Sequence, residues 1–346
     1  MKTQLLQNTD ACIITSNANR LYYTHFDTSN GIVVLTKNKD YFLTDFRYIE
    51  EATQVLGADF IVKTYDDESL KDTLKGILKN VKTVGIEEEI FYPVYKKLIE
   101  ALSGYEVKNI SPVLNILRSV KTDEEIALIE FAQNVNENAL DKIIRMIKAG
   151  ISERDLSIEL KYQLLKNGAD GFAFEPIVAF NKDTSKPHAK LGNLKLEYGD
   201  VIMLDFGAKY KYYCSDMTRT FCFGKCEDNE KISAYNLVLK AQTVALDHIK
   251  ADVPAAEIDS MVKEIFKANG CLEYFGHGLG HGVGLDIHEL PNLKQTSEDV
   301  LTQNMVVTVE PGLYFENSFG IRTEDLVIVT KDGVRNLTKF EKKFIL

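Results

Sequence analysis

The sequence predicts an α+β protein in two parts, a small α/β domain at residues 1–120 and a larger domain at residues 121–346 with an internal duplication. Three observations support this prediction. Strand-like and helix-like segments alternate up to about residue 118, a capped amphipathic helix begins near Lys121, and one helix-pair pattern then occurs twice. A length of 346 residues also fits two domains of ordinary size.

The composition indicates an ordered protein, because 45% of the residues are apolar and 27% are charged. A net charge of −10 argues against binding nucleic acid or anionic lipid through bulk charge. No apolar run approaches the roughly 20 residues that cross a bilayer, and residues 1–20 lack the apolar stretch of a secretory signal. We therefore expect a cytoplasmic protein with no nucleic-acid or membrane partner, which acts on small molecules, peptides or proteins.

The five cysteines are odd in number and widely spread, and none forms a Cys-x-x-Cys pair. In a reducing compartment they are expected to be free thiols.

The first domain is expected to contain four strands and two helices. The strands are predicted at residues 31–35, 41–44, 59–64 and 83–86, and the helices at residues 69–79 and 93–103. The second domain then begins with Thr122 and Glu125, which form a capping box ahead of a long helix with apolar residues on one face.

Residues 147–168 and 249–270 repeat one pattern at a constant offset of 102 residues. Ile-Lys-Ala is identical in both copies, apolar residues recur at the same helical spacing, and the segments end in Gly168 and Gly270. Each copy is expected to be a helix, a short turn and a second helix that ends at glycine, followed by strands. Two similar half-domains can face each other and place a site on the axis between them.

The strands after each helix pair carry acidic residues in apolar surroundings. In the first copy, residues 201–208 and 213–221 are expected to form a hairpin in which Asp205 lies opposite Asp216. In the second copy, residues 304–310 and 320–330 are expected to pair, and they carry Glu310 and Glu324. Like charges in such positions repel and are costly to bury, so a positive group should compensate them.

Two divalent cations would neutralise four carboxylates, and a two-metal centre can hold a hydroxide between its ions. Oxygen ligands favour magnesium, manganese or calcium, and one imidazole shifts the preference toward manganese, cobalt, iron or zinc. Residues 275–289 offer that imidazole, because they contain His277, His281 and His288 among five glycines that exclude a stable helix. His25 and His248 are expected to be structural.

Five motifs now carry a resemblance to a known family. They are Leu204-Asp205-Phe206-Gly207-Ala208, Cys214-Ser215-Asp216-Met217-Thr218-Arg219-Thr220, the glycine-rich segment that ends in His288-Glu289, Val309-Glu310-Pro311-Gly312-x-Tyr314, and Gly320-Ile321-Arg322-Thr323-Glu324-Asp325. Together they resemble the pita-bread metallopeptidases, which include aminopeptidase P, prolidase and methionine aminopeptidase. The resemblance is strong over residues 118–346. Residues 44–48 of the first domain are similar to the creatinase-type N-terminal domain of the aminopeptidase P and prolidase branch.

The resemblance implies a pita-bread catalytic domain that binds two divalent metal ions, with manganese first and cobalt, zinc or iron as alternatives. It implies that a hydroxide between the ions cleaves the peptide bond between an N-terminal residue and a following proline, and that the protein is a homodimer. The implied ligands, of which Asp216 and Glu324 would bridge the ions, are Asp205, Asp216, His281, Glu310 and Glu324.

The same resemblance implies further roles. His188 and His288 would lie beside the scissile amide, and Glu310 would transfer a proton to the leaving nitrogen. His277 would line the pocket for the proline ring. Arg322, grouped with these histidines on the substrate side, would hold a ligand carboxylate in orientation.

Two departures from the family pattern concern the backbone and the specificity. Asn181 and Asn304 stand where relatives usually have glycine, and asparagine tolerates a positive φ best after glycine. Phe180 and Lys182 replace smaller groups and are expected to affect substrate specificity.

Four hypotheses about the function stay open. Aminopeptidase and dipeptidase activity are not distinguished, since no residue identifies a site for a substrate's terminal carboxylate. Methionine aminopeptidase-like activity is disfavoured by the additional N-terminal domain, and a non-catalytic peptide-binding role is disfavoured by the complete ligand set.

Overall fold

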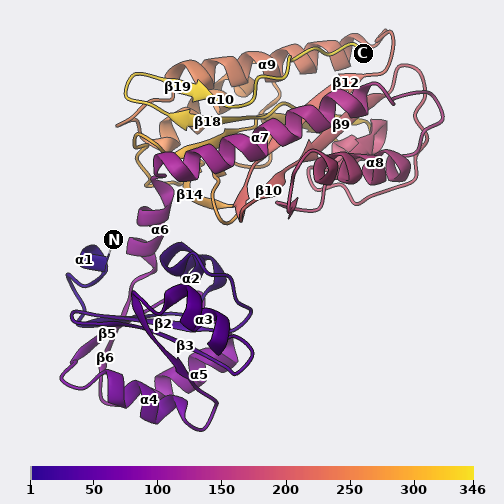
Figure 1. Cartoon of the computed structure of the whole chain (residues 1–346). Helices are drawn as coiled ribbons and strands as arrows, with labels where there is room; N and C mark the ends of the chain where they lie inside the picture. The colour runs from indigo at the N-terminus through magenta and orange to yellow at the C-terminus, as the bar shows by residue number, and fades with distance from the viewer. Residues whose placement is uncertain (1) are drawn as a thin grey trace. The chain divides into compact units, whose positions relative to one another are not determined.

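The computed structural model describes residues 2–346, in which the chain divides into two compact units. The first unit ends at Arg118 and the second runs from Ser119 to Leu346 (Figure 1). Among the described residues, no helix combines the length and the apolar character that crossing a bilayer requires. All five cysteines are free thiols.

The first unit is built on a six-stranded mixed sheet in the order β4-β3-β2-β1-β5-β6. The six predicted elements are confirmed to within two residues at each end. The elements are α1 (Lys2–Leu5), β1 (Ala11–Ile14), α2 (Asn17–Thr24), β2 (Ile32–Thr36), β3 (Asp40–Thr44), α3 (Ile49–Leu56), β4 (Phe60–Thr64), α4 (Leu70–Ile77), β5 (Thr83–Ile86), α5 (Tyr92–Ala101), β6 (Glu106–Asn109) and α6 (Ser111–Ser119). Ile13 joins the hydrophobic core on one face of the sheet and Ile14 the core on the other, so β1 is apolar without alternation.

The second unit contains two helix pairs and their strands. Its elements are α7 (Asp123–Ile144), α8 (Glu153–Lys166), β7 (Gly171–Phe172), β8 (Ile177–Phe180), η1 (Asn181–Ser185), β9 (Val201–Phe206), β10 (Ala208–Tyr210), β11 (Tyr213–Cys214), β12 (Met217–Cys222), α9 (Asn229–His248), α10 (Ala255–Ala268), η2 (Leu272–Tyr274), β13 (Gly280–Gly282), β14 (Glu289–Leu293), β15 (Val306–Val309), β16 (Gly312–Phe315), β17 (Phe319–Arg322), β18 (Asp325–Val329) and β19 (Val334–Asn336). The predicted capping box is confirmed, since Thr122 accepts from the backbone of Glu125 and Glu125 accepts from the backbone of Thr122.

The duplication predicted from the sequence is present in the backbone. Helices α8 and α10 have the same length at the predicted offset, and Gly168 and Gly270 follow both helices with a positive φ. The turn before each second helix also matches, because Gly150 donates to Leu196 and Asp252 donates to Leu301, each over 2.8 Å. The two copies therefore share their local hydrogen bonding as well as their helices.

The hairpin of the first copy forms with a register different from the predicted one. The turn is centred on Lys211 and Tyr212, both with positive φ, so Asp205 lies opposite Thr218 and not opposite Asp216. The difference is two residues, and side chains alternate with a period of two. The two aspartates consequently stay on one face of the sheet as diagonal neighbours.

The second copy pairs its strands as expected. Strand β15 is antiparallel to β18, and Val309 lies opposite Asp325, which places Glu310 and Glu324 at the next position on each strand. Residues 319–322 form a separate strand, β17, paired with β16. The two copies meet here, because the Glu324 amide donates to the carbonyl of Thr218 over 3.1 Å.

Candidate active site

The strand ends of the two copies converge on a cavity of about 400 Å³. Its lining includes the five proposed metal ligands, the three histidines assigned to the substrate side, and Arg322. Phe180 and Lys182 do not line it, because Phe180 is fully buried in the core and Lys182 borders a different hollow. The expectation that these two side chains affect substrate specificity therefore has no support in this cavity.

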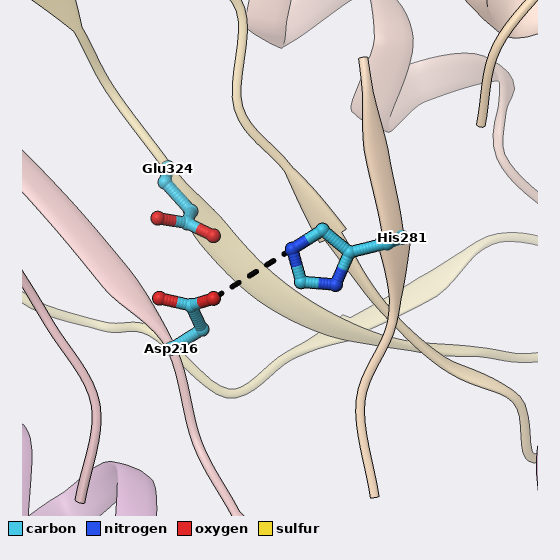
Figure 2. Close-up of side chains that lie close together, drawn as sticks. All are labelled: Asp216, His281 and Glu324. Atoms are coloured by element: carbon cyan, nitrogen blue, oxygen red, sulfur yellow. Dashed lines mark ion pairs between the residues drawn. The ribbon is translucent and has the colours of Figure 1, made fainter. Parts of the chain in front are cut away.

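Asp216 precedes β12, His281 lies in β13 and Glu324 precedes β18, and the three side chains point toward one another (Figure 2). One potential ligand atom from each lies within 4.8 Å of the others. The imidazole Nε2 of His281 is 3.7 Å from Asp216 and 3.3 Å from Glu310. Asp205 completes the group on the side of the first copy, where Arg322 donates to it.

Burial makes this cluster electrostatically costly. Burial, and then the charges of the neighbouring carboxylates, raise the pKa of Asp216 and of Glu324 well above their usual values. Burial also raises the pKa of Asp205, against the charge of Arg322. In contrast, the hydrogen bond and the charge of His281 outweigh burial and lower the pKa of Glu310 to about 2. A cation held among the carboxylates would relieve this repulsion.

Two buried oxygens in the cluster fit such a cation. Asp216 Oδ1 and Glu324 Oε1 are buried and accept no hydrogen bond from any residue between 2 and 346. Buried carboxylate oxygens normally have partners, so these two atoms are suited to metal coordination. The donor set of four carboxylates and one imidazole also suits divalent first-row metals.

Threonines orient two of the carboxylates, and the sequence reasoning did not assign them. Thr218 donates to Glu324 over 2.7 Å, and Thr308 donates to Glu310 over 3.1 Å. Thr218 lies two residues after Asp216, and Thr308 lies two residues before Glu310. The period of two along a strand places each threonine on the face of its neighbouring acid, which is the signal that could have identified both.

Arg322 begins a chain of hydrogen bonds that links Asp205, a proposed metal ligand, to the cavity wall. The guanidinium donates to Asp205 and, over 2.6 Å, to the hydroxyl of Tyr314. That hydroxyl is 3.0 Å from Nε2 of His277, whose Nδ1 is 2.8 Å from the carbonyl of Gly278. Burial raises the pKa of Tyr314 to about 12 and lowers the pKa of His277. Because a carbonyl can only accept, Nδ1 of the neutral imidazole donates to Gly278, and Nε2 accepts from the Tyr314 hydroxyl. Tyr314 belongs to one of the five family motifs, but the sequence did not predict a role for it.

The remaining histidines lie near the opening of the cavity. His188 and His288 are exposed and line the cavity, and the ring centroid of His288 is 4.3 Å from that of His281. Burial, followed by the charge of His281, lowers the pKa of His288. Asn181 and Asn304 adopt φ values of 44° and 69°, which confirms that asparagine keeps the positive φ at both positions.

Comparison with known proteins gives the family. The family model described as metallopeptidase family M24 matches residues 127–331, and the creatinase/prolidase N-terminal domain matches residues 6–120. An Xaa-Pro dipeptidase of Pyrococcus furiosus is 39% identical over 274 residues, which cover 79% of this chain and 78% of that protein.

Two solved structures resemble the whole chain. The Xaa-Pro dipeptidase of Bacillus anthracis has a TM-score of 0.93 and 35% identity, and covers 100% of this chain and 99% of that one. The X-Pro aminopeptidase of Thermotoga maritima has a TM-score of 0.90 and 34% identity, with 100% of both chains covered. The expected α+β fold and family are thereby confirmed: this chain has a creatinase-type N-terminal domain and a pita-bread catalytic domain, and it belongs to metallopeptidase family M24.

Proposed function

We propose that this protein hydrolyses the peptide bond between an N-terminal residue and a following proline. The observation that carries the proposal is the cluster of Asp216, His281 and Glu324 in a cavity whose two buried carboxylate oxygens have no hydrogen-bond donor among residues 2–346. Similarity to an Xaa-Pro dipeptidase and to an X-Pro aminopeptidase supports the choice of substrate.

We propose that Asp205, Asp216, His281, Glu310 and Glu324 hold two divalent cations, with manganese expected first. When bound, such ions polarise a carbonyl and lower the pKa of water, so that a hydroxide forms at neutral pH. Threonine hydroxyls and Arg322 hold the carboxylates in orientation through hydrogen bonds. Misoriented ligands would bind the metal less tightly and lower the reaction rate.

The other residues act on the substrate. Glu310 accepts a proton from the attacking water and passes it to the leaving nitrogen of proline. His188 and His288 stabilise the oxygen on which negative charge develops as the carbonyl is attacked. His277, kept neutral and oriented by Tyr314, borders the proline ring. A dedicated pocket is needed because proline has no N–H and a fixed φ.

The test is an assay of the full chain, stripped with a chelator and reconstituted with manganese, on alanyl-proline, alanyl-prolyl-alanine and alanyl-alanine. We expect cleavage of at least one proline substrate, little cleavage of alanyl-alanine, and no activity before metal is added. Cleavage of methionyl peptides without proline would favour methionine aminopeptidase-like activity. Peptide binding without cleavage in any metal would favour a non-catalytic role, and either result would overturn the proposal.

We also propose that the protein is a homodimer, on the basis of the family resemblance. Light scattering coupled to gel filtration tests this, and a monomer at assay concentration would contradict it.

A further inference from the structure

A buried ion network adjoins Glu324 but takes no part in the proposed reaction. Arg219 on β12 is 1% exposed and pairs over 3.0 Å with Asp325, which is fully buried. Lys342 adds a second cation, 2.5 Å from the other carboxylate oxygen of Asp325. These three residues do not line the cavity. Because such buried pairs often cost as much to desolvate as their attraction returns, stability alone does not explain the network.

The guanidinium of Arg219 also donates to three backbone carbonyls. Its Nη1 donates to Glu324 over 2.6 Å and to Thr218 over 3.0 Å, and its Nη2 donates to Phe340 over 2.8 Å. Glu324 is a proposed bridging ligand, and Thr218 orients its carboxylate through a hydrogen bond of 2.7 Å. Arg219 therefore holds the main chain of both residues that this hydrogen bond joins.

The contact between the two copies uses the same carbonyls. The Thr218 carbonyl accepts from the Glu324 amide over 3.1 Å and also from Arg219. The Glu324 carbonyl, on the other side of the same residue, accepts the shortest of the Arg219 hydrogen bonds. A carboxylate reaches only the positions that its main chain and its own hydrogen bonds allow. Holding the Glu324 backbone at both ends therefore restricts where its carboxylate can point.

The segment after β19, residues 337–346, supplies two of the contacts in this network. Its Phe340 carbonyl accepts from Arg219 over 2.8 and 3.3 Å. Its Lys342 is the second cation of the network. Two backbone hydrogen bonds to Cys222, over 2.5 and 3.0 Å, attach the rest of the segment to β12. A segment that does not line the cavity is thus connected to a proposed metal ligand through one arginine.

We propose that Arg219 is a positioning residue for the metal centre, and that Lys342 supports it by balancing the buried charge of Asp325. The inference rests on the proposed function, because it concerns the affinity of the same cluster for divalent cations. Without Lys342, Arg219 is the one cation paired with Asp325 among residues 2–346, and the carboxylate draws it away from the Glu324 carbonyl. Residues 337–346 therefore affect how tightly the cavity holds its ions.

The test measures manganese binding to the chelator-stripped full chain by calorimetry. Arg219→Lys keeps the charge beside Asp325, but a single ammonium does not reproduce the planar guanidinium that donates to three carbonyls at once. The dissociation constant for manganese should rise about tenfold or more, as it does when other groups that orient metal ligands are lost. Lys342→Met, which removes the second cation, should raise the dissociation constant by a smaller factor.

Lys343→Met is the matched control, because Lys343 is exposed and adjoins Lys342 in the same segment. This variant should bind manganese as the wild type does. Thermal unfolding of each metal-free variant, followed by circular dichroism, gives the temperatures at which the chain is folded and the calorimetry is valid. A purely structural role would lower the unfolding midpoint and leave the dissociation constant of the folded chain unchanged, whereas a positioning role raises that constant.

The outcomes separate the two proposals. A wild type that binds no manganese overturns the proposed metal centre and the positioning role together. A wild type that binds manganese, with the same dissociation constant in folded Arg219→Lys, overturns only the positioning role. If Arg219→Lys does not fold, Lys342→Met decides: a constant equal to that of Lys343→Met overturns the inference, and a higher one supports it. If only Lys342→Met is unchanged, the part assigned to residues 337–346 is overturned.

Discussion

Each copy of the helix pair has a buried acid that accepts hydrogen bonds from backbone amides, but the two acids stand at different positions. In the first copy, Glu153 at the start of α8 is fully buried and accepts from the backbone amides of Phe180, over 2.8 Å, and Leu194, over 3.1 Å. In the second copy the equivalent position is Ala255, and Asp259, one turn later on α10, accepts from the amide of Leu279 over 3.0 Å. Each acid holds its helix by hydrogen bonds to the segment that leads to the cavity. The two copies therefore share this kind of interaction, although they use residues at different positions.

The same comparison holds for the proposed metal ligands. Each copy supplies two carboxylates, one at the end of an outgoing strand and one at the start of the returning strand, Asp205 with Asp216 and Glu310 with Glu324. Only the second copy adds an imidazole, His281 on β13. Duplication therefore accounts for the four acids, while the histidine would make the proposed metal centre asymmetric.

The largest expected effect tests whether the copies contribute equally to the metal centre. Asp216→Ala and Glu324→Ala each remove a proposed bridging ligand and should each reduce metal affinity and kcat/KM by about a hundredfold or more, above the cost of losing an outer contact. Metal content by mass spectrometry and peptide assays measure the two losses. Full activity in either variant would contradict the bridging assignment.

The next effect concerns the buried ion pair between Lys121, just before α7, and Glu289, at the start of β14. The ammonium of Lys121 is 3.2 Å from Glu289, with side chains 1% and 6% exposed, and Glu289 adjoins His288. Lys121→Met leaves a buried carboxylate without this partner and should lower the free energy of unfolding by about 3–5 kcal/mol. Denaturant unfolding checks this. The double variant with Glu289→Leu should recover much of the loss, and a double variant as unstable as Lys121→Met would refute the pairing argument.

A smaller effect tests the two buried acids Glu153 and Asp259 directly. Glu153→Gln places an NH₂ group against one of two amide donors, and Asp259→Asn loses the 2.7 Å ion pair with Lys263. Each should cost about 1–3 kcal/mol of unfolding free energy. Glu264→Gln, on an exposed position of α10, is the control and should change stability by less than about 0.5 kcal/mol. If only one of the two variants is destabilised, the copies are not equivalent in this respect.

The sequence predicts the parts of this molecule that depend on local signals. The capping box at Thr122, the repeat at 102 residues and the glycines that end α8 and α10 all involve residues close in the chain. The four acids were identified from their apolar strand context and the histidine from its glycine-rich segment. The charge of the four acids indicated divalent cations, the family motifs implied the set of five ligands, and both stay proposals.

The remaining features depend on signals that the sequence does not carry locally. The predicted hairpin register was wrong, because Lys211 and Tyr212 adopt a positive φ without the Asn-Gly or Asp-Gly pair that usually marks such a turn. The link from Arg322 through Tyr314 to His277 joins residues up to 45 positions apart, and Arg322 reaches Asp205 across 117. Phe180 was placed on the substrate side from the family pattern, but position along the chain does not reveal which way a strand residue points, and the side chain lies in the core.

The smallest effect tests whether the positive φ alone determines which residue stands at the two equivalent turns. Gly150 and Asp252 occupy equivalent positions with φ values of 82° and 67°. A Cβ at Gly150 would meet nothing within 4 Å, so Gly150→Ala should cost about 1 kcal/mol through the left-handed conformation alone. Asp252→Gly relieves that conformation but adds freedom to the unfolded chain, and should change stability by less than about 0.5 kcal/mol. Thermal unfolding of both variants decides the point: equal losses would show that side-chain contacts, and not the shared φ, set the residue at each turn.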